Sequence, residues 1–298
     1  MTKVIKAHIA VFIVNLIYGA NFTIAKGIMP EHIKPLGFVM MRVVVALLLF
    51  WIVDSFNPKQ KIAKGDIKRL VLCGLFGVAI NQMLFFKGLS LTTPINGAII
   101  MTTNPILVLI TAAIIIKERI TTRKVAGIAL GIIGALCLLL FGKHFSFGGD
   151  TFMGDLYIFI NAMSYGIFLV IAKPLMKKYT PLTVIKWSFF FGSLLVVPFG
   201  ISELNQVNWS SFTSEIWLGV TYVVIAVTFI AYLLNTIALT TLSPAVVSFY
   251  IYLQPLFATL ISLFLGKDQL TPIKVLSSVL IFTGVYLVSV PPRERLFK

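Results

Sequence analysis

Charged residues are scarce in this sequence. Only 12% of the 298 residues are Asp, Glu, Lys or Arg, and only 10 residues are acidic. Soluble domains contain about 25% charged residues. Hydrophobic residues instead make up 58% of the chain, and the mean hydropathy is +0.99. A water-soluble fold of this length could not bury so much apolar surface. The composition therefore excludes a soluble globular protein and indicates a membrane protein.

Residues and motifs typical of catalytic or metal sites are also rare. The 2 cysteines lie in apolar stretches and the 3 histidines are scattered, which excludes a disulfide framework and a thiolate metal site. The sequence contains no H-E-x-x-H pair, no G-x-x-x-x-G-K-[ST] loop and no G-x-S-x-G elbow. The spaced glycines Gly127, Gly131 and Gly134 indicate helix packing, since no strand precedes them. We expect no cofactor, no bound metal and no catalysis, and an intramembrane enzyme is the weaker alternative.

The basic residues number 25 and give a formal net charge of +15. They occur in short clusters between apolar runs, so we expect the lipid bilayer, and no nucleic acid, as a partner. A helix needs about 20 residues to cross the hydrocarbon layer. We therefore predict an all-α membrane protein with ten transmembrane helices near residues 7–26, 36–54, 69–88, 94–116, 123–141, 153–173, 182–201, 214–237, 244–265 and 272–290.

The distribution of the basic clusters predicts the orientation. If the N-terminus is cytoplasmic, 17 Lys and Arg residues lie in cytoplasmic segments and 6 in external ones. The cytoplasmic set is Lys3, Lys6, Lys59, Lys61, Lys64, Lys68, Arg69, Lys117, Arg119, Arg123, Lys124, Lys173, Lys177, Lys178, Arg293, Arg295 and Lys298. The external set is Lys26, Lys34, Lys87, Lys143, Lys267 and Lys274. Because positive loops stay in the cytoplasm, we predict a multi-pass protein of the inner (plasma) membrane with both termini cytoplasmic.

An internal repeat underlies the predicted helices. A shift of 150 residues superimposes two long stretches, and a shift of 147 superimposes the earlier part of each half. The matching pairs include Pro94 with Pro244, Pro105 with Pro255, Glu118 with Asp268, Thr121 with Thr271, Gly134 with Gly284, Tyr18 with Tyr165, and Lys26 with Lys173. Prolines, glycines and acidic residues in one register are harder to obtain by chance than apolar identities. We infer a first five-helix repeat at 1–147 and a second at 148–298, together forming one compact transmembrane domain.

The odd number of helices in each repeat determines how the repeats are related. A second copy of five helices enters the membrane from the opposite side, so the repeats are inverted about an axis in the membrane plane. Inverted halves can exchange conformations and expose one central site to each side in turn. We therefore predict alternating access to a site between the repeats.

Polar residues inside the predicted helices are the candidates for that site, because an unsatisfied polar group is costly within a membrane. Asn15, Tyr18 and Asn21 recur at three-residue spacing and share one helix face. The predicted cavity residues are Asn15, Tyr18, Asn21, Arg42, Gln82, Phe86, Thr102, Asn161, Tyr165, Tyr232, Asn235 and Tyr252. Any one of them could instead bond to a neighbouring helix or to its own backbone. As a set at repeat-related positions, they favour a cavity with aromatic and amide walls.

Other residues within the predicted helices are candidates for gating, kinks and membrane anchoring. Arg42 lies about two turns into its helix, where it could extend to the outer surface, act in a gate or bind a substrate carboxylate. Pro105 and Pro255 fall in mid-helix and predict kinks that act as hinges. Lys26 and Lys173 lie at helix ends and are interpreted as anchors at the membrane interface.

Several short motifs follow one another in the order of a known family. They are Tyr18-Gly19-Ala20-Asn21-Phe22, Arg42 followed by Ala46, Pro105 with Glu118-Arg119-Ile120-Thr121, Gly127 with Gly131 and Gly134, and Pro255 with Asp268 and Gly284. In this order they resemble the EamA-type branch of the drug/metabolite transporter superfamily over essentially the whole chain. Tyr18 stands where Trp is common in that family, and Asp268 where Glu is common. The resemblance implies a ten-helix exporter of amino acids or related metabolites and does not identify the cargo.

Acidic residues are absent from the middle of every predicted helix. Proton relays and sodium sites usually use a buried carboxylate, so we expect facilitated diffusion or exchange of a small-molecule substrate. Two alternatives stay open. Phosphorylated sugars or nucleotide-sugars would require several convergent Arg and Lys residues. A lipid-handling membrane subunit would transport nothing. The sequence indicates no oligomeric state.

Overall fold

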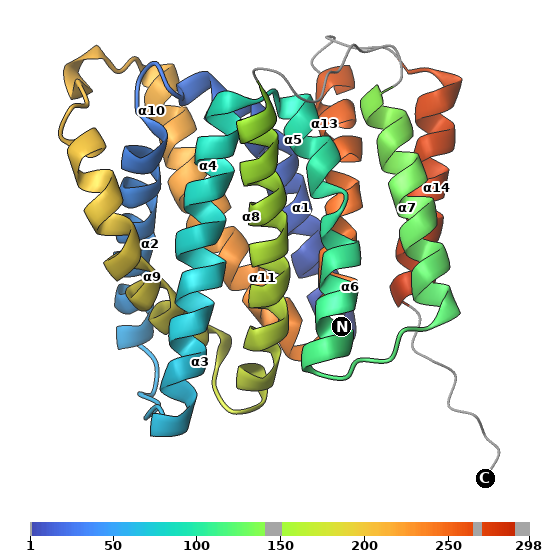
Figure 1. The fold of residues 1–298 in the computed structure, drawn as a ribbon, viewed down its shortest axis with the longest axis horizontal. Helices are drawn as coiled ribbons and strands as arrows, with labels where there is room; N and C mark the ends of the chain where they lie inside the picture. Colours follow the sequence, from blue (N-terminus) through green and yellow to red (C-terminus); the bar gives the residue numbers. More distant parts are fainter. Residues whose placement is uncertain (1, 141–150, 265–269, 290–298) are drawn as a thin grey trace.

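The computed structural model describes residues 2–140, 151–264 and 270–289, and every regular element in these ranges is a helix (Figure 1). Ten helical segments there are long and apolar enough to cross a membrane. The first five are α1 (Lys3–Ile28), α2 (Pro35–Ser55), α3–η1–α4 (Lys64–Gly74, Leu75–Ile80, Asn81–Leu91), α5–α6 (Pro94–Met101, Asn104–Ile115) and α7 (Thr122–Leu140). The second five are α8 (Phe152–Ala172) extended by η3 (Lys173–Lys177), α9 (Pro181–Leu204), α10–η5–α11 (Ser214–Thr221, Tyr222–Ile230, Ala231–Thr241), α12–η6–α13 (Pro244–Phe249, Tyr250–Tyr252, Leu253–Phe264) and α14 (Pro272–Ser289).

Each of these spans overlaps its predicted range, so the prediction of ten transmembrane helices is confirmed. A short helix, η4 (Trp209–Ser211), precedes α10. Some residues used to predict the repeat and the orientation lie outside the described residues: Lys143, Lys267, Asp268, Arg293, Arg295 and Lys298.

A Ser or Thr followed by Pro begins several of the spans. Thr93, Thr180 and Ser243 are the N-caps of α5, α9 and α12, and each side-chain oxygen accepts a hydrogen bond from the backbone amide three residues later. Proline follows each of them, at the first helical position, where its fixed φ suits the helix and its missing amide leaves no hydrogen bond unmade. These dipeptides therefore set where the helices start.

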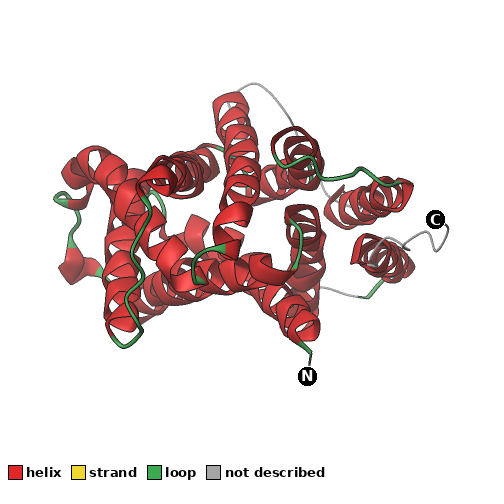
Figure 2. Ribbon diagram, turned by 90° about the horizontal axis from the view of Figure 1, so that it is seen from below, coloured by secondary structure: helices red, strands yellow, loops and turns green. Residues whose placement is uncertain are grey.

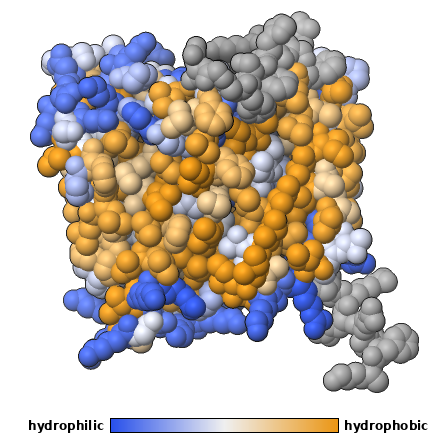
Figure 3. All heavy atoms as spheres, in the orientation of Figure 1, coloured by the Kyte–Doolittle hydropathy of each residue, from blue (hydrophilic) through white to orange (hydrophobic). Residues whose placement is uncertain are grey.

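A belt of apolar side chains surrounds the bundle, between two edges where hydrophilic residues gather (Figure 3). Large apolar side chains are exposed on the helices, including Leu48, Ile114 and Phe264. Soluble monomers rarely expose contiguous apolar surface on this scale. The exposed helix faces therefore form the lipid-facing surface of a multi-pass membrane protein.

The two sets of five spans form one bundle of inverted repeats. Because each set has an odd number of spans, corresponding helices run in opposite directions, as α1 and α8 do in Figure 1. Corresponding helices also pack in pairs, α2 against α9 at one end of the bundle and α7 against α14 at the other (Figures 1 and 2). Between these pairs, α4 packs on α8 and α1 on α11. The prediction of two inverted five-helix repeats is confirmed.

The third span of each repeat contains a π-helical segment in its middle. These segments are η1 and η5, and the 150-residue shift places the whole of η1 inside η5. A π-helical turn holds an extra residue, so it displaces the side chains beyond it from the α-helical register, and such turns often accompany functional sites. The irregularity is thus a shared property of the two repeats.

The fourth span of each repeat is interrupted. A turn at Thr102 separates α5 from α6, and the tight turn η6 separates α12 from α13. Thr102 and Tyr252 each lie three residues before a proline, Pro105 or Pro255, whose ring and missing amide disturb the preceding helical turn. The hydroxyl of Tyr252 donates to the carbonyl of Thr102 at 3.0 Å. The two interruptions therefore meet through residues that the repeat relates to each other.

The spaced glycines of α7 pack as predicted. A Cβ atom at Gly127 would lie 2.9 Å from the carbonyl oxygen of Gly284, and one at Gly134 would lie 2.8 Å from that of Ser277. Gly131 faces the ring of Tyr252. These distances leave no room for a side chain, so α7 and α14 touch through their backbones.

Candidate functional site

A cavity lies in the middle of the bundle, where spans of both repeats meet. About 680 Å³ of atom-free space lies there, a figure that includes open space at the mouth of the cavity. Ten of the twelve predicted cavity residues line it: Asn15, Tyr18, Asn21, Arg42, Gln82, Phe86, Asn161, Tyr165, Tyr232 and Asn235. The fold thus brings together side chains from α1, α2, α4, α8 and α11.

Thr102 and Tyr252 are not among the residues that line this cavity. The hydroxyl of Thr102 donates to the carbonyl of Ile99 in its own helix at 2.6 Å, and Tyr252 bonds to the Thr102 carbonyl. The two residues therefore do not line the cavity as predicted. They bond instead to backbone carbonyls, in the same helix for Thr102 and in another helix for Tyr252, which was the stated alternative. The action of Pro105 and Pro255 as hinges stays a prediction.

Asn81 lines the cavity although it was not predicted to do so, and the polar residue Gln254 of the ninth span lines it as well. The π-helical segment η1 ends just before Asn81, and its extra residue shifts the register there. Gln254 was recognisable as the repeat partner of Asn104, and its Nε2 donates to Oδ1 of Asn15 at 2.9 Å.

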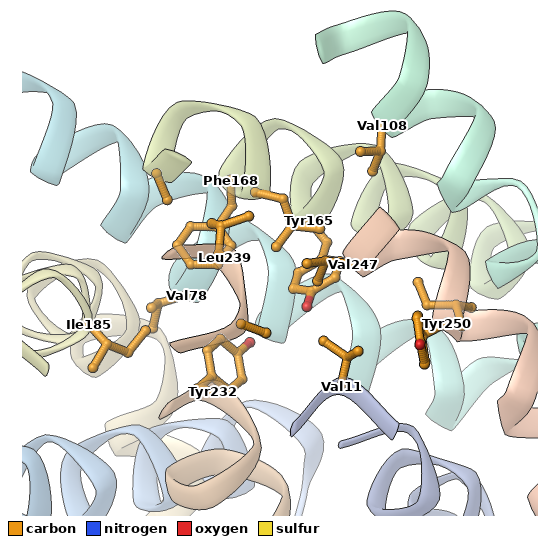
Figure 4. Close-up of a cluster of buried hydrophobic side chains, with 14 of the residues drawn as sticks. Val11, Val78, Val108, Tyr165, Phe168, Ile185, Tyr232, Leu239, Val247 and Tyr250 are labelled. Atoms are coloured by element: carbon orange, nitrogen blue, oxygen red, sulfur yellow. The ribbon is translucent and has the colours of Figure 1, made fainter. Parts of the chain in front are cut away.

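Hydrogen bonds join the polar walls of the cavity across helices. The Tyr232 hydroxyl donates to Oδ1 of Asn81 at 2.9 Å, and Nδ2 of Asn161 donates to the Asn81 carbonyl at 2.7 Å. Nδ2 of Asn235 donates to the Tyr165 hydroxyl at 2.9 Å. Figure 4 shows the hydroxyls of Tyr165 and Tyr232 pointing toward the space between the two rings. The network therefore holds both rings in defined orientations at the cavity wall.

Arg42 is buried at the cavity wall, with only 2% of its surface exposed. Its Nε donates to the Thr228 hydroxyl at 2.7 Å, and its Cζ lies 4.2 Å from the centre of the Phe86 ring. The Thr228 hydroxyl in turn donates to the carbonyl of Val223, five residues earlier in the π-helical segment η5. The side chain therefore does not extend to the outer surface, which was one of the roles that the sequence left open.

Several buried polar atoms of the cavity wall make no hydrogen bond to any described residue. They are Nη1 of Arg42, both amide atoms of Gln82, and the side-chain oxygens of Asn21 and Asn161. Gln82 lies four residues before Phe86 on α4, so its amide is on the helix face that Arg42 covers. Buried polar groups in proteins are normally bonded. The unpartnered atoms therefore mark where the polar groups of a ligand would bind.

One positive charge dominates the electrostatics of the cavity. Among the described residues that line it, Arg42 is the only charged one, and none is Asp or Glu. Phe22, Phe85 and Met101 supply apolar wall. In the described part of the chain, no group of three or more His, Cys, Asp or Glu residues is placed to hold a metal ion. The cavity thus offers one guanidinium, several amides and apolar contact.

A lysine binds the end of the third span in each repeat. Nζ of Lys26 donates at 2.8, 3.0 and 3.0 Å to the carbonyls of Leu89, Ser90 and Thr92. Nζ of Lys173 donates at 2.7, 3.4 and 2.8 Å to the carbonyls of Leu239, Thr240 and Leu242. We call these two arrangements the lysine clamps. The repeat relates them residue by residue, and they lie at opposite membrane edges, at the upper end of α4 and the lower end of α11 in Figure 1.

The clamps replace the interpretation of Lys26 and Lys173 as anchors at the membrane interface. Each ammonium group instead satisfies carbonyls that the end of a helix leaves without partners. The negative end of the helix dipole favours a cation at this position. The lysines therefore hold the first span of each repeat to the third.

Acidic residues at the ends of α2 and α9 join these two helices at both membrane edges. Asp54 forms an ion pair with Lys186. At the other edge, Oε2 of Glu203 accepts hydrogen bonds from the amides of Leu36 and Gly37 at 2.7 and 3.0 Å. Lys186 is thus bound to a carboxylate and is not one of the residues that line the cavity. It supplies no second positive charge there for a phosphorylated ligand.

Comparison with known proteins identifies the family of this chain. The sequence model of the EamA-like transporter family matches the chain twice, at residues 5–140 and 152–290. This chain belongs to the EamA-like transporter family. Each match covers one set of five spans. Membership assigns the protein a transport function, with a small-molecule substrate that binds within the bilayer.

Relatives of this EamA-like transporter match it over between about half and nearly all of their lengths. It is similar to the uncharacterized transporter YyaM of Bacillus subtilis, with 27% identity over 95% of this chain and 94% of that protein. It is also similar to a probable terminal-alkyne amino-acid exporter of Streptantibioticus cattleyicolor, with 24% identity over 54% of this chain and 53% of that protein. One protein crystal structure, 17% identical, shares the fold with a TM-score of 0.77 and covers 95% of this chain and 98% of that one.

Proposed function

We propose that this EamA-like transporter exports amino acids or related small amphipathic compounds by alternating access. The main support for this proposal is the central cavity, because its walls combine unpartnered amides, a guanidinium and aromatic rings. Such walls suit a small molecule with polar groups at one end and an apolar side chain at the other. The amino-acid exporter among the relatives supports the same class of cargo.

The two lysine clamps serve as gates in this proposal. One clamp lies at each membrane edge, and both are built from equivalent residues of inverted repeats. Equivalent contacts have similar strength, so the states opened at either edge have comparable free energies and can exchange. Breaking one clamp while the other holds would expose the cavity to one side only.

The proposal includes the orientation of the chain in the membrane and the boundary between its repeats. We place both termini in the cytoplasm and the protein in the inner (plasma) membrane. The excess of positive charge on the segments that lie on the same side of the membrane as the N-terminus supports this orientation. We set the repeats at 1–147 and 148–298, within one compact transmembrane domain. The two family matches, which end at 140 and begin again at 152, support a boundary between them.

Transport by the purified chain tests this function. In proteoliposomes that contain only this protein, we expect saturable uptake of at least one compound from a panel of labelled neutral, aromatic and basic amino acids. Without a buried carboxylate in the described part of the cavity wall, we expect the rate to be independent of an imposed pH gradient. Protein-free liposomes are the control. Flux only of sugar phosphates, or of none of these compounds, would contradict the proposal.

The orientation is tested by labelling single cysteines in intact cells after replacement of Cys73 and Cys137. We expect a membrane-impermeant maleimide to modify Trp209→Cys, between α9 and α10, and to leave Lys61→Cys, between α2 and α3, unmodified until the cells are opened. The reason is that the segment at Lys61 lies among basic residues and the segment at Trp209 does not. The reverse pattern would place the termini outside.

A further inference from the structure

Arg42 is a buried cation without a counter-ion among the described residues that line the cavity. Its contacts are one neutral hydroxyl and one aromatic face, and its Nη1 has no hydrogen-bond partner among the described residues. A charged side chain at membrane depth is costly unless it is paired and fully bonded. Thr228 and Phe86 hold the guanidinium in place but supply no negative charge. The described residues of the cavity wall therefore supply no negative charge to pair with Arg42.

The amides that line the same cavity as Arg42 limit which anion fits. The unpartnered oxygens of Gln82, Asn21 and Asn161 are acceptors, so they require a ligand that also carries N–H or O–H donors. A phosphate dianion would require further Arg or Lys residues, and Arg42 is the only charged group among the described lining residues. A ligand with a net positive charge would meet Arg42 with no carboxylate nearby to offset the repulsion.

We infer that Arg42 is the specificity-determining residue of the cavity and binds the carboxylate of the cargo, while the amides of Gln82, Asn21 and Asn161 bind its donor groups. The cargo class is then a small carboxylate that carries hydrogen-bond donors and has no net positive charge, such as a zwitterionic amino acid. Amines without a carboxylate, and basic amino acids, are rejected. This inference rests on the proposed transport function and names the chemical group that the site recognises.

Binding to the detergent-purified protein tests the inference without any requirement for flux. We would measure ligand-induced thermal stabilisation by leucine, 4-methylpentanoate and isopentylamine. These compounds share one apolar side chain, and the second lacks the ammonium group of leucine while the third lacks its carboxylate. We expect leucine to bind most tightly and isopentylamine to require about 100-fold higher concentration, the ratio typical of losing a buried charge-assisted bond. The amino acid identified by the flux measurement would be tested with its own pair of analogues.

Two variants connect this preference to Arg42. Arg42→Gln should weaken leucine binding about 100-fold. It should strengthen isopentylamine binding, because it removes the repulsion between the two cations, so the preference for the carboxylate is lost. Arg42→Lys keeps the positive charge but loses the planar guanidinium and its bond to Thr228, so it should retain part of the preference for the carboxylate. Lys87→Met, which changes a lysine of α4 that does not line the cavity, is the control and should bind all three compounds as the unmodified protein does.

The inference has outcomes that would overturn it. Equal binding of isopentylamine and leucine, or undiminished leucine binding by Arg42→Gln, would show that the carboxylate is not recognised by Arg42. Tighter binding of glucose 1-phosphate than of leucine would assign the cation to a phosphate. Absence of binding by both carboxylates, together with flux of other compounds, would overturn the inference and leave the transport function standing. If Arg42→Gln does not fold, the ligand series on the unmodified protein decides alone.

Discussion

Replacing Lys173 with methionine should open the cavity at the membrane edge where α8 and α11 end, and replacing Lys26 should open it at the opposite edge. Each substitution removes three hydrogen bonds from an ammonium group to backbone carbonyls. Bonds to charged groups contribute about 1.5–3 kcal/mol when fully made, and part of that is recovered when water reaches an opened edge. We therefore expect each variant to increase the population of the state that is open at the edge of the lost clamp by about tenfold or more.

The measurement uses a single cysteine at Met101, which lines the cavity, in a chain without Cys73 and Cys137. A membrane-impermeant maleimide is applied separately to right-side-out and inside-out vesicles, and the labelling rate of the cysteine is measured in each. We expect the ratio of the two rates to change in opposite directions for Lys26→Met and Lys173→Met. Lys87→Met, outside both clamps, should leave the ratio unchanged. A shift in the same direction for both variants would show that the clamps support the fold and do not act as gates.

Replacing Gly74 with valine should disrupt the packing of α3 on α9. A Cβ atom at this position would lie 2.7 Å from the backbone nitrogen of Gly192 and 2.8 Å from the carbonyl oxygen of Ser188. Backbone atoms cannot move aside as the end of a flexible side chain can, so the two helices must separate. Overpacking of this kind typically costs up to about 3 kcal/mol, and sometimes more.

Gly65→Val is the matched control, because a Cβ atom at Gly65, on the same helix, would have no neighbour within 4 Å. Thermal unfolding in detergent, followed by the loss of monodisperse protein on size exclusion, should show a melting temperature several degrees lower for Gly74→Val only. Equal stability of the two variants would mean that α3 and α9 are not held in contact at this point.

Much of the fold was predictable because a membrane restricts what a helix can contain. Each span must be apolar for about 20 residues, so the ten spans appear directly in the sequence. The duplication was visible for a related reason: Pro94 and Pro244 begin equivalent helices, and Gly134 and Gly284 lie where α7 and α14 approach closely. Positions whose backbone geometry tolerates few residue types keep the register of a repeat.

The cavity could be predicted only in part. Helix periodicity was sufficient for Asn15, Tyr18 and Asn21, which share one face of α1 and reach the same space. It failed for Asn81, because the π-helical segment before it changes the direction in which later side chains point. It also failed for Tyr252, because the helix break that precedes Pro255 turns its hydroxyl onto the carbonyl of Thr102.

The class of molecule follows from the amino-acid sequence: a ten-helix membrane protein made of two inverted repeats, with a polar lining between them. These properties follow from composition, run length and register, which are local or additive along the chain. The contacts of each polar residue, in contrast, depend on how the helices pack. Lys26 and Lys173 bind helix ends, Lys186 pairs with Asp54, and Arg42 keeps a donor at the cavity wall that no described residue bonds. The physical reason is that a hydrogen bond requires a partner about 3 Å away, and in this fold that partner comes from a distant part of the chain.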